Sequence, residues 1–403
     1  MNIGIVAYIN PSEFKEYFDD SVKLPNINRG ASAVNTITLG LLKAGENITI
    51  ISSYPSKGST QHFYGKNISI HLVSTYNSFP KSNVIEKYYM INRIKKELSL
   101  HIDSLDIIHT HWTYDFAMAC SYFSNIKPLV CTIRDWAPII KKYEKGHRKL
   151  LWYLIQERLF KKVLSNRNIH FIANSRYIFE LMKKTYPQNE CNIIENPIKK
   201  EFILQNRESY PASPIIISIS QDLMDLRKNY TKLLEAFCIF RKTNPDAKLY
   251  LVGAFNKNHV IFKSWERNNL LNGVNFLGFI NHDHLIKLLD KASMLIHPSL
   301  EESFGNTLLE GMARRIPVIG GKNSGAVPYV LGHGKYGYLA DVTDVEDILA
   351  TITIASKEAN NKNIINNATS YLLKNMNEEV ISMRHITLFE EILRYKEKGN
   401  EQI

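Results

Sequence analysis

The 403-residue chain contains few cysteines and no long uninterrupted hydrophobic run. Its four cysteines, Cys120, Cys131, Cys191 and Cys238, are widely spaced and form no Cys-x-x-Cys pair, which favours buried thiols over a disulfide framework. No stretch approaches the roughly 18 to 20 apolar residues that span a bilayer. The first residues, MNIGIVAYIN, lack the basic and apolar segments of a signal peptide. These absences indicate a cytoplasmic protein that contacts a membrane at most peripherally.

Acidic residues are also scarce relative to basic ones. The chain has 39 Asp and Glu against 50 Lys and Arg, which gives a formal net charge of +11. Such an excess is typical of proteins that bind nucleic acid, an anionic membrane or a phosphorylated small molecule, and charge alone does not choose among them. With 44% hydrophobic and 22% charged residues, the composition excludes wholesale disorder. The length suggests more than one domain.

Two halves of the chain repeat one pattern, in which short β-branched runs alternate with amphipathic stretches. One such stretch is GASAVNTITLGLLKAG, residues 30–45, in which Gly45 is expected to end the helix. After Asn196-Pro197 a charged run interrupts the pattern, which resumes with IIISIS and AKLYLVGA. Alternating strands and helices predict doubly wound parallel sheets. We predict an N-terminal domain over 1–197, a linker over 198–213, a second domain over 214–376 and a final helix over 377–403 that crosses back to the first domain.

The segment LEESFGNTLLEGMA, residues 300–313, places carboxylates on both sides of a glycine turn. We expect a helix from about Asn306, with Glu302 before it and Glu310 in its second turn, facing the same cleft. Amide groups at such a helix start bind phosphate, Gly305 permits close approach, and Asn306 or Thr307 is expected to cap. A nucleotide diphosphate sugar would match this arrangement. The alternative is an acidic turn that only complements the helix dipole, and the spacing does not decide between them.

A longer run, HPSLEESFGNTLLEGMARRIPVIGGKNSGAVPYVLGHGKYGYLADVTD, resembles the E-x7-E region of retaining family 4 glycosyltransferases. That family has the GT-B fold, an α/β architecture of two Rossmann-like doubly wound domains that face each other across a cleft. The resemblance implies that Glu302 contacts the donor sugar and Glu310 binds the ribose. It further implies that the turn between them holds the diphosphate, through Phe304, Gly305, Asn306 and Thr307. Tyr329 departs from the family, which often has glutamate there, and we expect this change to concern packing.

Two basic residues, Arg227 and Lys228, follow the strand-like IIISIS. At a helix start they oppose the helix dipole unless an anion is bound, and the alternative is a solvated surface pair. The resemblance implies that this pair neutralises the donor diphosphate and its leaving charge. Asn229 stands where the family usually has glycine.

In the first half, DIIHTHWTYDF and CTIRDWAP are similar to the HxHW and T-x-H-D or T-x-R-D segments of a bacterial polysaccharide and lipopolysaccharide branch of the family. We expect His109 and His111 to point to opposite faces of their strand, so that they share no metal, with His111 reaching the cleft. Arg134 is expected to hold a phosphate or orient the reacting sugar, or else to form a structural ion pair with Asp135. Gly30 occupies the position of a family Gly-Gly near the donor phosphate or acceptor.

No convincing metal site is found in the sequence. The run NHDH, residues 281–284, is expected to cap a helix, and no Asp-x-Asp follows a strand-like run. We therefore predict no metal and no cofactor. Residues 141–167 contain nine Lys or Arg with only Glu144 and Glu157. This segment is expected either to associate with the inner membrane surface or to pack its apolar face on the first domain.

These observations predict a retaining, metal-independent glycosyltransferase. It would move a sugar from a UDP- or GDP-sugar to a hydroxyl of a glycan, expected to be lipid-linked and part of a bacterial surface polysaccharide such as an O-antigen or capsule. The resemblance implies a front-face mechanism, in which the leaving phosphate helps to deprotonate the acceptor. The alternatives are a sugar-nucleotide epimerase or hydrolase on the same fold and a non-catalytic nucleotide or glycan binder. An RNA-binding protein is a third, although no nucleic-acid motif accompanies the charge.

Overall fold

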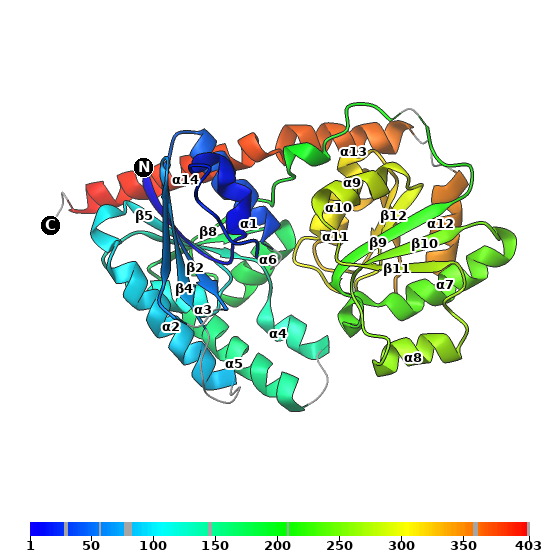
Figure 1. The fold of residues 1–403 in the computed structure, drawn as a ribbon, viewed down its shortest axis with the longest axis horizontal. Helices are drawn as coiled ribbons and strands as arrows, with labels where there is room; N and C mark the ends of the chain where they lie inside the picture. The colour runs from blue at the N-terminus through cyan, green and yellow to red at the C-terminus, as the bar shows by residue number, and fades with distance from the viewer. Residues whose placement is uncertain are drawn as a thin grey trace. The chain divides into compact units, whose positions relative to one another are not determined.

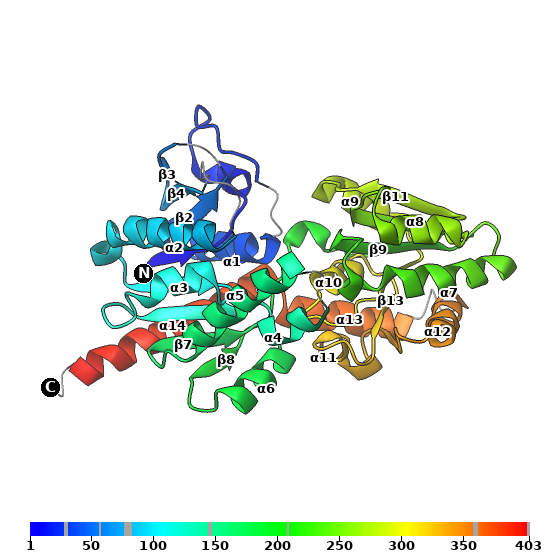
Figure 2. The same cartoon turned by 90° about the horizontal axis from the view of Figure 1, so that it is seen from below.

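The computed structural model describes the chain except for residues 28–30, 56–57, 76–82, 144–146, 208, 358–361 and 401–403. The chain forms two compact units, one comprising Met1–Pro197 with Glu378–Ile403 and the other comprising Ile198–Asn377. Each unit has a mainly parallel sheet with helices on both faces (Figures 1 and 2). The predicted α/β class of two doubly wound domains is therefore confirmed. We call the two parts unit 1 and unit 2.

Unit 1 contains an eight-stranded sheet in the order β3-β4-β2-β1-β5-β6-β7-β8. Among the strands of this unit that the structure describes, only β3 runs antiparallel to its neighbour, β4. The strands are β1 (Asn2–Val6), β2 (Asn47–Tyr54), β3 (Gln61–Gly65), β4 (Ile68–Ser74), β5 (Ile107–His111), β6 (Leu129–Ile133), β7 (Ile169–Ala173) and β8 (Cys191–Ile193). The helices are α1 (Ser32–Lys43), α2 (Asn83–Ser99), α3 (Asp115–Ser121), α4 (Ala137–Ile140), α5 (His147–Leu164), α6 (Arg176–Thr185) and α14 (Glu378–Asn400).

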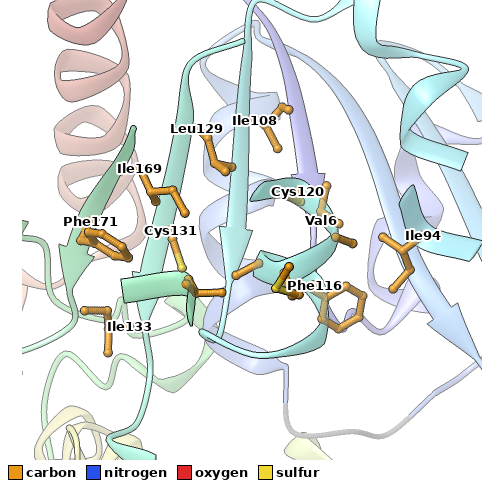
Figure 3. Packing of buried hydrophobic residues seen from close by; sticks show 14 of the residues in the cluster. Val6, Ile94, Ile108, Phe116, Cys120, Leu129, Cys131, Ile133, Ile169 and Phe171 are labelled. Atoms are coloured by element: carbon orange, nitrogen blue, oxygen red, sulfur yellow. The ribbon is translucent and has the colours of Figure 1, made fainter. Parts of the chain in front are cut away.

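Both faces of the unit 1 sheet are buried because alternate strand residues point to opposite sides. Ile107 packs with α1 and α14 on one face, whereas the next residue, Ile108, packs with α2, α3 and α5 on the other. Figure 3 shows the second cluster, where Cys131 lies beside Leu129 and Ile169.

All four cysteines are free; Cys120 and Cys131 are buried as predicted, but Cys191 and Cys238 are partly exposed.

Unit 2 contains a six-stranded parallel sheet in the order β11-β10-β9-β12-β13-β14. Its strands are β9 (Ile215–Asp222), β10 (Lys248–Ala254), β11 (Val274–Gly278), β12 (Met294–His297), β13 (Val318–Gly321) and β14 (Tyr338–Ala340). The helices are α7 (Tyr230–Thr243), α8 (Val260–Arg267), α9 (His282–Asp290), α10 (Asn306–Ala313), α11 (Val327–Val330), α12 (Val345–Lys357) and α13 (Lys362–Asn375). In Figure 1, α10 lies on the opposite face of this sheet from α7 and α12.

The linker predicted over 198–213 is instead the first part of unit 2. The Ile198 amide donates to the Met376 carbonyl at 2.8 Å, and the Leu204 amide donates to the Ala313 carbonyl at 2.9 Å. Phe202 lies in the core of unit 2 with 2% of its surface exposed. The interpretation as a linker was wrong because two apolar side chains, Ile198 and Phe202, are buried in the core of unit 2. They hold the otherwise polar segment on the surface of this unit.

The last helix, α14, belongs to unit 1 although unit 2 precedes it in the chain. Ile381 and Phe389 are fully buried in the same cluster as α1. Gly40 of α1 allows this contact, since a Cβ atom there would lie 1.9 Å from the Ser382 hydroxyl.

Gly45 ends α1 as predicted, with φ of +92° and its amide donating to the Leu42 carbonyl. No helix in the described part of the chain has the length and apolarity needed to cross a bilayer.

Candidate functional site

The first candidate site of unit 2 lies where β12 leads into α10. The helix begins at Asn306, as predicted, and Gly305 precedes it in the left-handed region with φ of +93°. Gly305 is the N-cap residue and offers no side chain as a cap, so the prediction that Asn306 or Thr307 caps α10 was wrong. The Thr307 hydroxyl lies 3.0 Å from Nδ1 of His297. The first turn of α10 carries the positive end of the helix dipole. Phe304, in contrast, is buried in the core.

Glu302 lies at the centre of a charged cluster. Its Oε1 is 2.5 Å from Nζ of Lys228 and 3.0 Å from Nε2 of His297. Burial alone would raise the pKa of the Glu302 carboxyl, but the charges and hydrogen bonds of Lys228, His297 and Arg227 hold that pKa well below its usual range. The structure thus brings the predicted residues Glu302 and Lys228 into direct contact, as a carboxylate and an ammonium group.

Lys228 is positioned by an unusual turn. Arg227 and Lys228 lie in a 3-10 turn, Leu226–Lys228, and not in the first turn of α7 as expected. Asn229 then adopts φ of +58°, and its side-chain amide donates to the carbonyls of Pro298 and Val342. This left-handed conformation explains why glycine is usual at this position of the family. The Asn229 bonds also join the turn to the segment that carries Glu302.

The basic pair is not a solvated surface pair. The side chains of Lys228 and Arg227 are only 13% and 19% exposed. Arg227 donates to the Glu301 carbonyl at 3.2 Å and pairs with Asp225 at 3.4 Å, whereas its nearest contact with Glu302 is 4.0 Å. Lys228 is therefore the cation that faces Glu302 directly, and Arg227 supports the neighbouring backbone.

Glu310 lies in the second turn of α10, as predicted. Its Oε2 atom is buried and has no hydrogen-bond partner among the described residues. Burial raises the pKa of Glu310 to about 7, against the opposing effect of Lys199. A buried hydrogen-bond acceptor without a donor lowers the stability of the folded state, unless a ligand supplies the missing donor. Lys199 was missed in the sequence because it lies in the segment interpreted as a linker.

The candidate site of unit 1 lies at the carboxyl ends of the neighbouring strands β5 and β6. Arg134, directly after β6, donates through Nε to Nδ1 of His111 at 3.2 Å and through Nη1 to the Asn196 side chain at 2.8 Å. The expectation that His109 and His111 point to opposite faces was wrong, because residues two apart on a strand share a face. Their rings lie 4.1 Å apart, and both are fully buried. His111 is thus not an exposed group at the site.

The tautomer of His111 follows from its contacts. Burial and the neighbouring His109, Arg134 and His385 lower the pKa of His111 well below its usual value, so the ring is neutral. Nδ1 accepts from Arg134, and the single ring proton consequently lies on Nε2. In the part of the chain that the structure describes, this Nε2 is buried and has no hydrogen-bond partner. His111 therefore presents an N–H donor that the protein does not use.

Two further features mark this end of the sheet. Trp112 has φ of +63°, which is strained for a bulky side chain and is found mainly where function requires it. The guanidinium carbon of Arg134 lies 5.8 Å from the Trp112 ring centre.

Burial lowers the pKa of Arg134 to about 9, so it remains charged at neutral pH. Asp135, the expected ion-pair partner, accepts a hydrogen bond from Tyr114 at 2.5 Å. Gly30 lies outside the described residues.

Comparison with known families decides the identity of this arrangement. Residues 31–202 match the family described as Glycosyltransferase Family 4, and residues 199–371 match Glycosyl transferases group 1. Between them the two matches include the candidate residues of both units, apart from Gly30. The chain belongs to the GT-B glycosyltransferases.

Known relatives of this glycosyltransferase agree with the assignment. The chain is 26% identical over 310 residues to an N-acetyl-alpha-D-glucosaminyl L-malate synthase of Bacillus anthracis, covering 74% of this chain and 77% of the relative. It is also 26% identical to the O-antigen biosynthesis glycosyltransferase WclY of Escherichia coli, over 56% of this chain and 64% of the relative. A sucrose-phosphate synthase from Thermosynechococcus elongatus has a similar fold, with a TM-score of 0.77 at 15% identity, over 98% of this chain and 100% of that structure.

Several residues of the two candidate sites were not predicted. His297 ends β12 and contacts both Glu302 and Thr307, and its position directly before the E-x7-E segment could have indicated this role. Asn196 and His385 carried no local signal, because they reach the unit 1 cluster from distant parts of the chain.

The two remaining sequence expectations have different outcomes. The run at 281–284 caps α9 as predicted, since the Asn281 side chain accepts from the His284 amide at 2.9 Å. In the basic segment, Phe160 and Leu164 of α5 are buried in the core of unit 1. The apolar face of this helix therefore packs on the first domain, which is one of the two interpretations given above. Leu154 on the same helix is 47% exposed. Association with a membrane stays a prediction.

Proposed function

We propose that this glycosyltransferase moves a sugar from a UDP- or GDP-sugar to a hydroxyl of a lipid-linked bacterial glycan, with retention of the anomeric configuration and without a metal ion. The observation that carries the proposal is the cluster of Lys228, Glu302 and His297 beside the start of α10. It combines a cation, a buried carboxylate and the positive end of a helix dipole within one loop-helix junction.

The diphosphate of the donor would bind between Lys228 and the amide end of α10. Without a ligand, Lys228 pairs with Glu302 at 2.5 Å. A diphosphate competes for this ammonium group, and its charge is further stabilised by the helix dipole. As the sugar–phosphate bond breaks, negative charge grows on the leaving oxygen, where preorganised cations and amides stabilise the transition state. Lys228 and the helix dipole would thus stabilise the negative charge on the leaving diphosphate, a task that a divalent ion performs in metal-dependent transferases.

The nucleoside would be held by Glu310. Its buried Oε2 atom has no partner among the described residues and is suited to accept hydrogen bonds from the ribose hydroxyls. Glu302, eight residues earlier, would accept from hydroxyls of the donor sugar.

We infer retention from the family resemblance, and the character of Glu302 is compatible with a front-face mechanism. A carboxylate whose pKa is held far below normal by Lys228 and His297 is a weak base and a weak nucleophile. We therefore assign Glu302 to sugar binding and not to a covalent intermediate. The leaving phosphate would take the acceptor proton on the same face of the sugar, which preserves the configuration.

The acceptor assignment rests on unit 1 and on one relative. The Nε2–H group of His111, held in place by Arg134, is buried, and we propose that it donates to a substrate oxygen once acceptor binding opens this end of the sheet. WclY, named for O-antigen biosynthesis, supports a glycan acceptor. The relative that covers more of the chain is named for L-malate, so a small carboxylic acid is the second candidate acceptor.

The experiment is a matrix of UDP- and GDP-sugars against a lipid-linked glycan, L-malate and no acceptor, with nucleotide release as the measurement. Release that requires the glycan supports the proposal, and release that requires L-malate replaces its acceptor. Release without any acceptor indicates a hydrolase, and conversion of the donor sugar indicates an epimerase. Tight donor binding without turnover would show a non-catalytic binder. The anomeric proton coupling of the product tests retention, and added Mg²⁺ or Mn²⁺ should not change the rate.

A further inference from the structure

A second group of chemically active side chains lies at one edge of the unit 1 sheet. His62 of β3 and His71 of β4 are direct cross-strand partners. Glu97, in the last turn of α2, and His101, two residues beyond the end of that helix, approach the same point. β2 and β1 separate these strands from β5, which carries His111. The proposed glycosyl transfer uses none of these residues.

Three donor atoms of this group form a compact triangle. Nδ1 of His62 and Nδ1 of His71 are 2.7 Å apart. Oε1 of Glu97 lies 3.6 Å from the first and 3.4 Å from the second. Zinc binds His nitrogen and carboxylate oxygen at about 2.0 to 2.2 Å in a tetrahedron, whose ligand atoms are then roughly 3.3 Å apart. One ion fits between these atoms after shifts of a few tenths of an ångström.

The tautomer of His71 agrees with this arrangement. Its Nε2 is 3.1 Å from the Ser69 hydroxyl, and that hydroxyl can itself donate to Thr49. Nε2–H then donates to Ser69, which leaves the lone pair of Nδ1 directed at His62 and Glu97. Such a hydrogen bond on the far nitrogen is the usual way in which a protein orients a metal-binding histidine.

The charge of the group is incomplete without a cation. The Glu97 side chain is only 8% exposed, and within the described residues its contacts are the rings of His62, His71 and His101. A buried carboxylate requires a positive partner. A divalent ion would provide one and would use both imidazole lone pairs.

We propose that unit 1 binds one Zn²⁺ ion, or a similar borderline divalent ion, through Nδ1 of His62, Nδ1 of His71 and Oε1 of Glu97. Water completes the tetrahedron, and His101 holds Glu97 through its Nε2 at 3.4 Å. Because His62 is 40% exposed, the ion can enter from solvent. The ion has a structural role: it joins the antiparallel edge strand β3 to the end of α2.

The test uses the full-length protein with any affinity tag removed. After treatment with a chelator and its removal, Zn²⁺ is titrated by calorimetry, and bound metal is measured by mass spectrometry. We expect one Zn²⁺ per chain, a higher Tm with Zn²⁺ than without it, and the visible absorption of tetrahedral Co²⁺ when Co²⁺ replaces Zn²⁺.

The variants are His62→Gln, at an exposed site where folding should tolerate the change, and Glu97→Gln, which keeps the shape of the side chain. Each should weaken Zn²⁺ binding at least tenfold and remove the Tm increase. His170→Gln is the matched control, because His170 pairs with Glu190 at 3.0 Å elsewhere on unit 1. Absence of stoichiometric Zn²⁺ binding in the wild type, or equal binding in the wild type and both variants, would overturn the proposal.

Discussion

At the scale of single residues, the site of unit 2 depends on the pairing of opposite charges before any substrate arrives. Lys228 and Glu302 neutralise each other in a largely buried position, where Nε2 of His297 lies 3.0 Å from the same carboxylate oxygen. This pairing keeps the cluster stable, because an unpaired buried charge is expensive. Under the proposed function, a donor diphosphate would displace Glu302 from Lys228 by offering comparable negative charge, which favours nucleotide diphosphates over uncharged sugars.

Lys228→Ala should lower kcat about 100- to 1,000-fold, because it removes the cation assigned to the leaving diphosphate. Lys228→Arg should retain part of the activity, since the charge remains but its geometry changes. The measurement is steady-state kinetics with the donor found in the matrix experiment. Lys232→Ala is the control, because Lys232 pairs with Glu235 on the exposed side of α7. An unchanged kcat in Lys228→Ala would rule out the assigned role of this residue.

Glu310 should make stability depend on pH. Its folded pKa of about 7 exceeds the usual unfolded value of about 4.3, so its protonation stabilises the folded state. That contribution is complete below about pH 4 and is lost as pH rises through 7. Relative to Glu310→Gln, the wild type should lose several degrees of Tm between pH 5 and pH 8. Thermal unfolding over this range, without donor, is the measurement.

Two outcomes would contradict this prediction. A Tm difference between Glu310→Gln and the wild type that is constant with pH would mean that Glu310 does not titrate in this range. A difference that falls as pH rises would mean that the folded pKa is depressed. Glu310→Ala should separately raise the donor KM, because it removes the carboxylate that we assign to the ribose.

At the scale of elements, the start of α10 requires glycine. Gly305 has φ of +93°, and a Cβ atom there would lie 2.9 Å from Leu308 Cδ1. Gly305→Ala should therefore cost about 1 to 2 kcal/mol of stability through backbone strain and should also move the loop that carries Glu302. Gly45→Ala is the matched control, because Gly45 has nearly the same φ, +92°, with no atom near its Cβ position.

Kinetics separate the two glycine variants. Both should unfold at lower denaturant concentration than the wild type, but only Gly305→Ala should raise the donor KM. Equal donor KM values in the two variants would mean that the conformation of the α10 start does not matter for donor binding.

Local patterns predicted the elements better than they predicted their contacts. The start of α10 at Asn306 and the end of α1 at Gly45 follow from residue types within one turn, and both are confirmed. The linker was wrong because the burial of Phe202 depends on partners far along the chain. For the same reason, the contact of Arg134 with Asn196, 62 positions away, was not foreseen.

At the scale of the whole molecule, the order of the chain does not follow the two units. α14 completes unit 1 only after unit 2 has been made, and its Ile381 and Phe389 fill the core beside α1. His385, on the same helix, lies 5.3 Å from the ring of His109. The residues near His111 thus come from the first half of the sequence and from its last helix, and unit 1 is incomplete without that helix.

The net charge of +11 should direct the protein to anionic membranes through α5. Arg158 and Lys162 are exposed on this helix near the exposed Leu154, whereas Lys161 is paired with Glu157. Each basic residue near an anionic surface contributes about 1 kcal/mol, so losing two weakens binding about thirtyfold and replacing them by glutamate should weaken it further. The measurement is sedimentation with vesicles that contain phosphatidylglycerol, using the double variant Arg158→Glu, Lys162→Glu.

The control must change the net charge equally, because the total charge of the protein also attracts it to the vesicles. Lys242→Glu with Lys374→Glu does so at two exposed positions of unit 2. If α5 is the contact surface, the α5 variant loses binding, the unit 2 variant keeps most of it, and high salt weakens the wild type. Equal losses in both variants would mean that the attraction is general and that α5 only packs on unit 1. Neutral vesicles should bind neither variant.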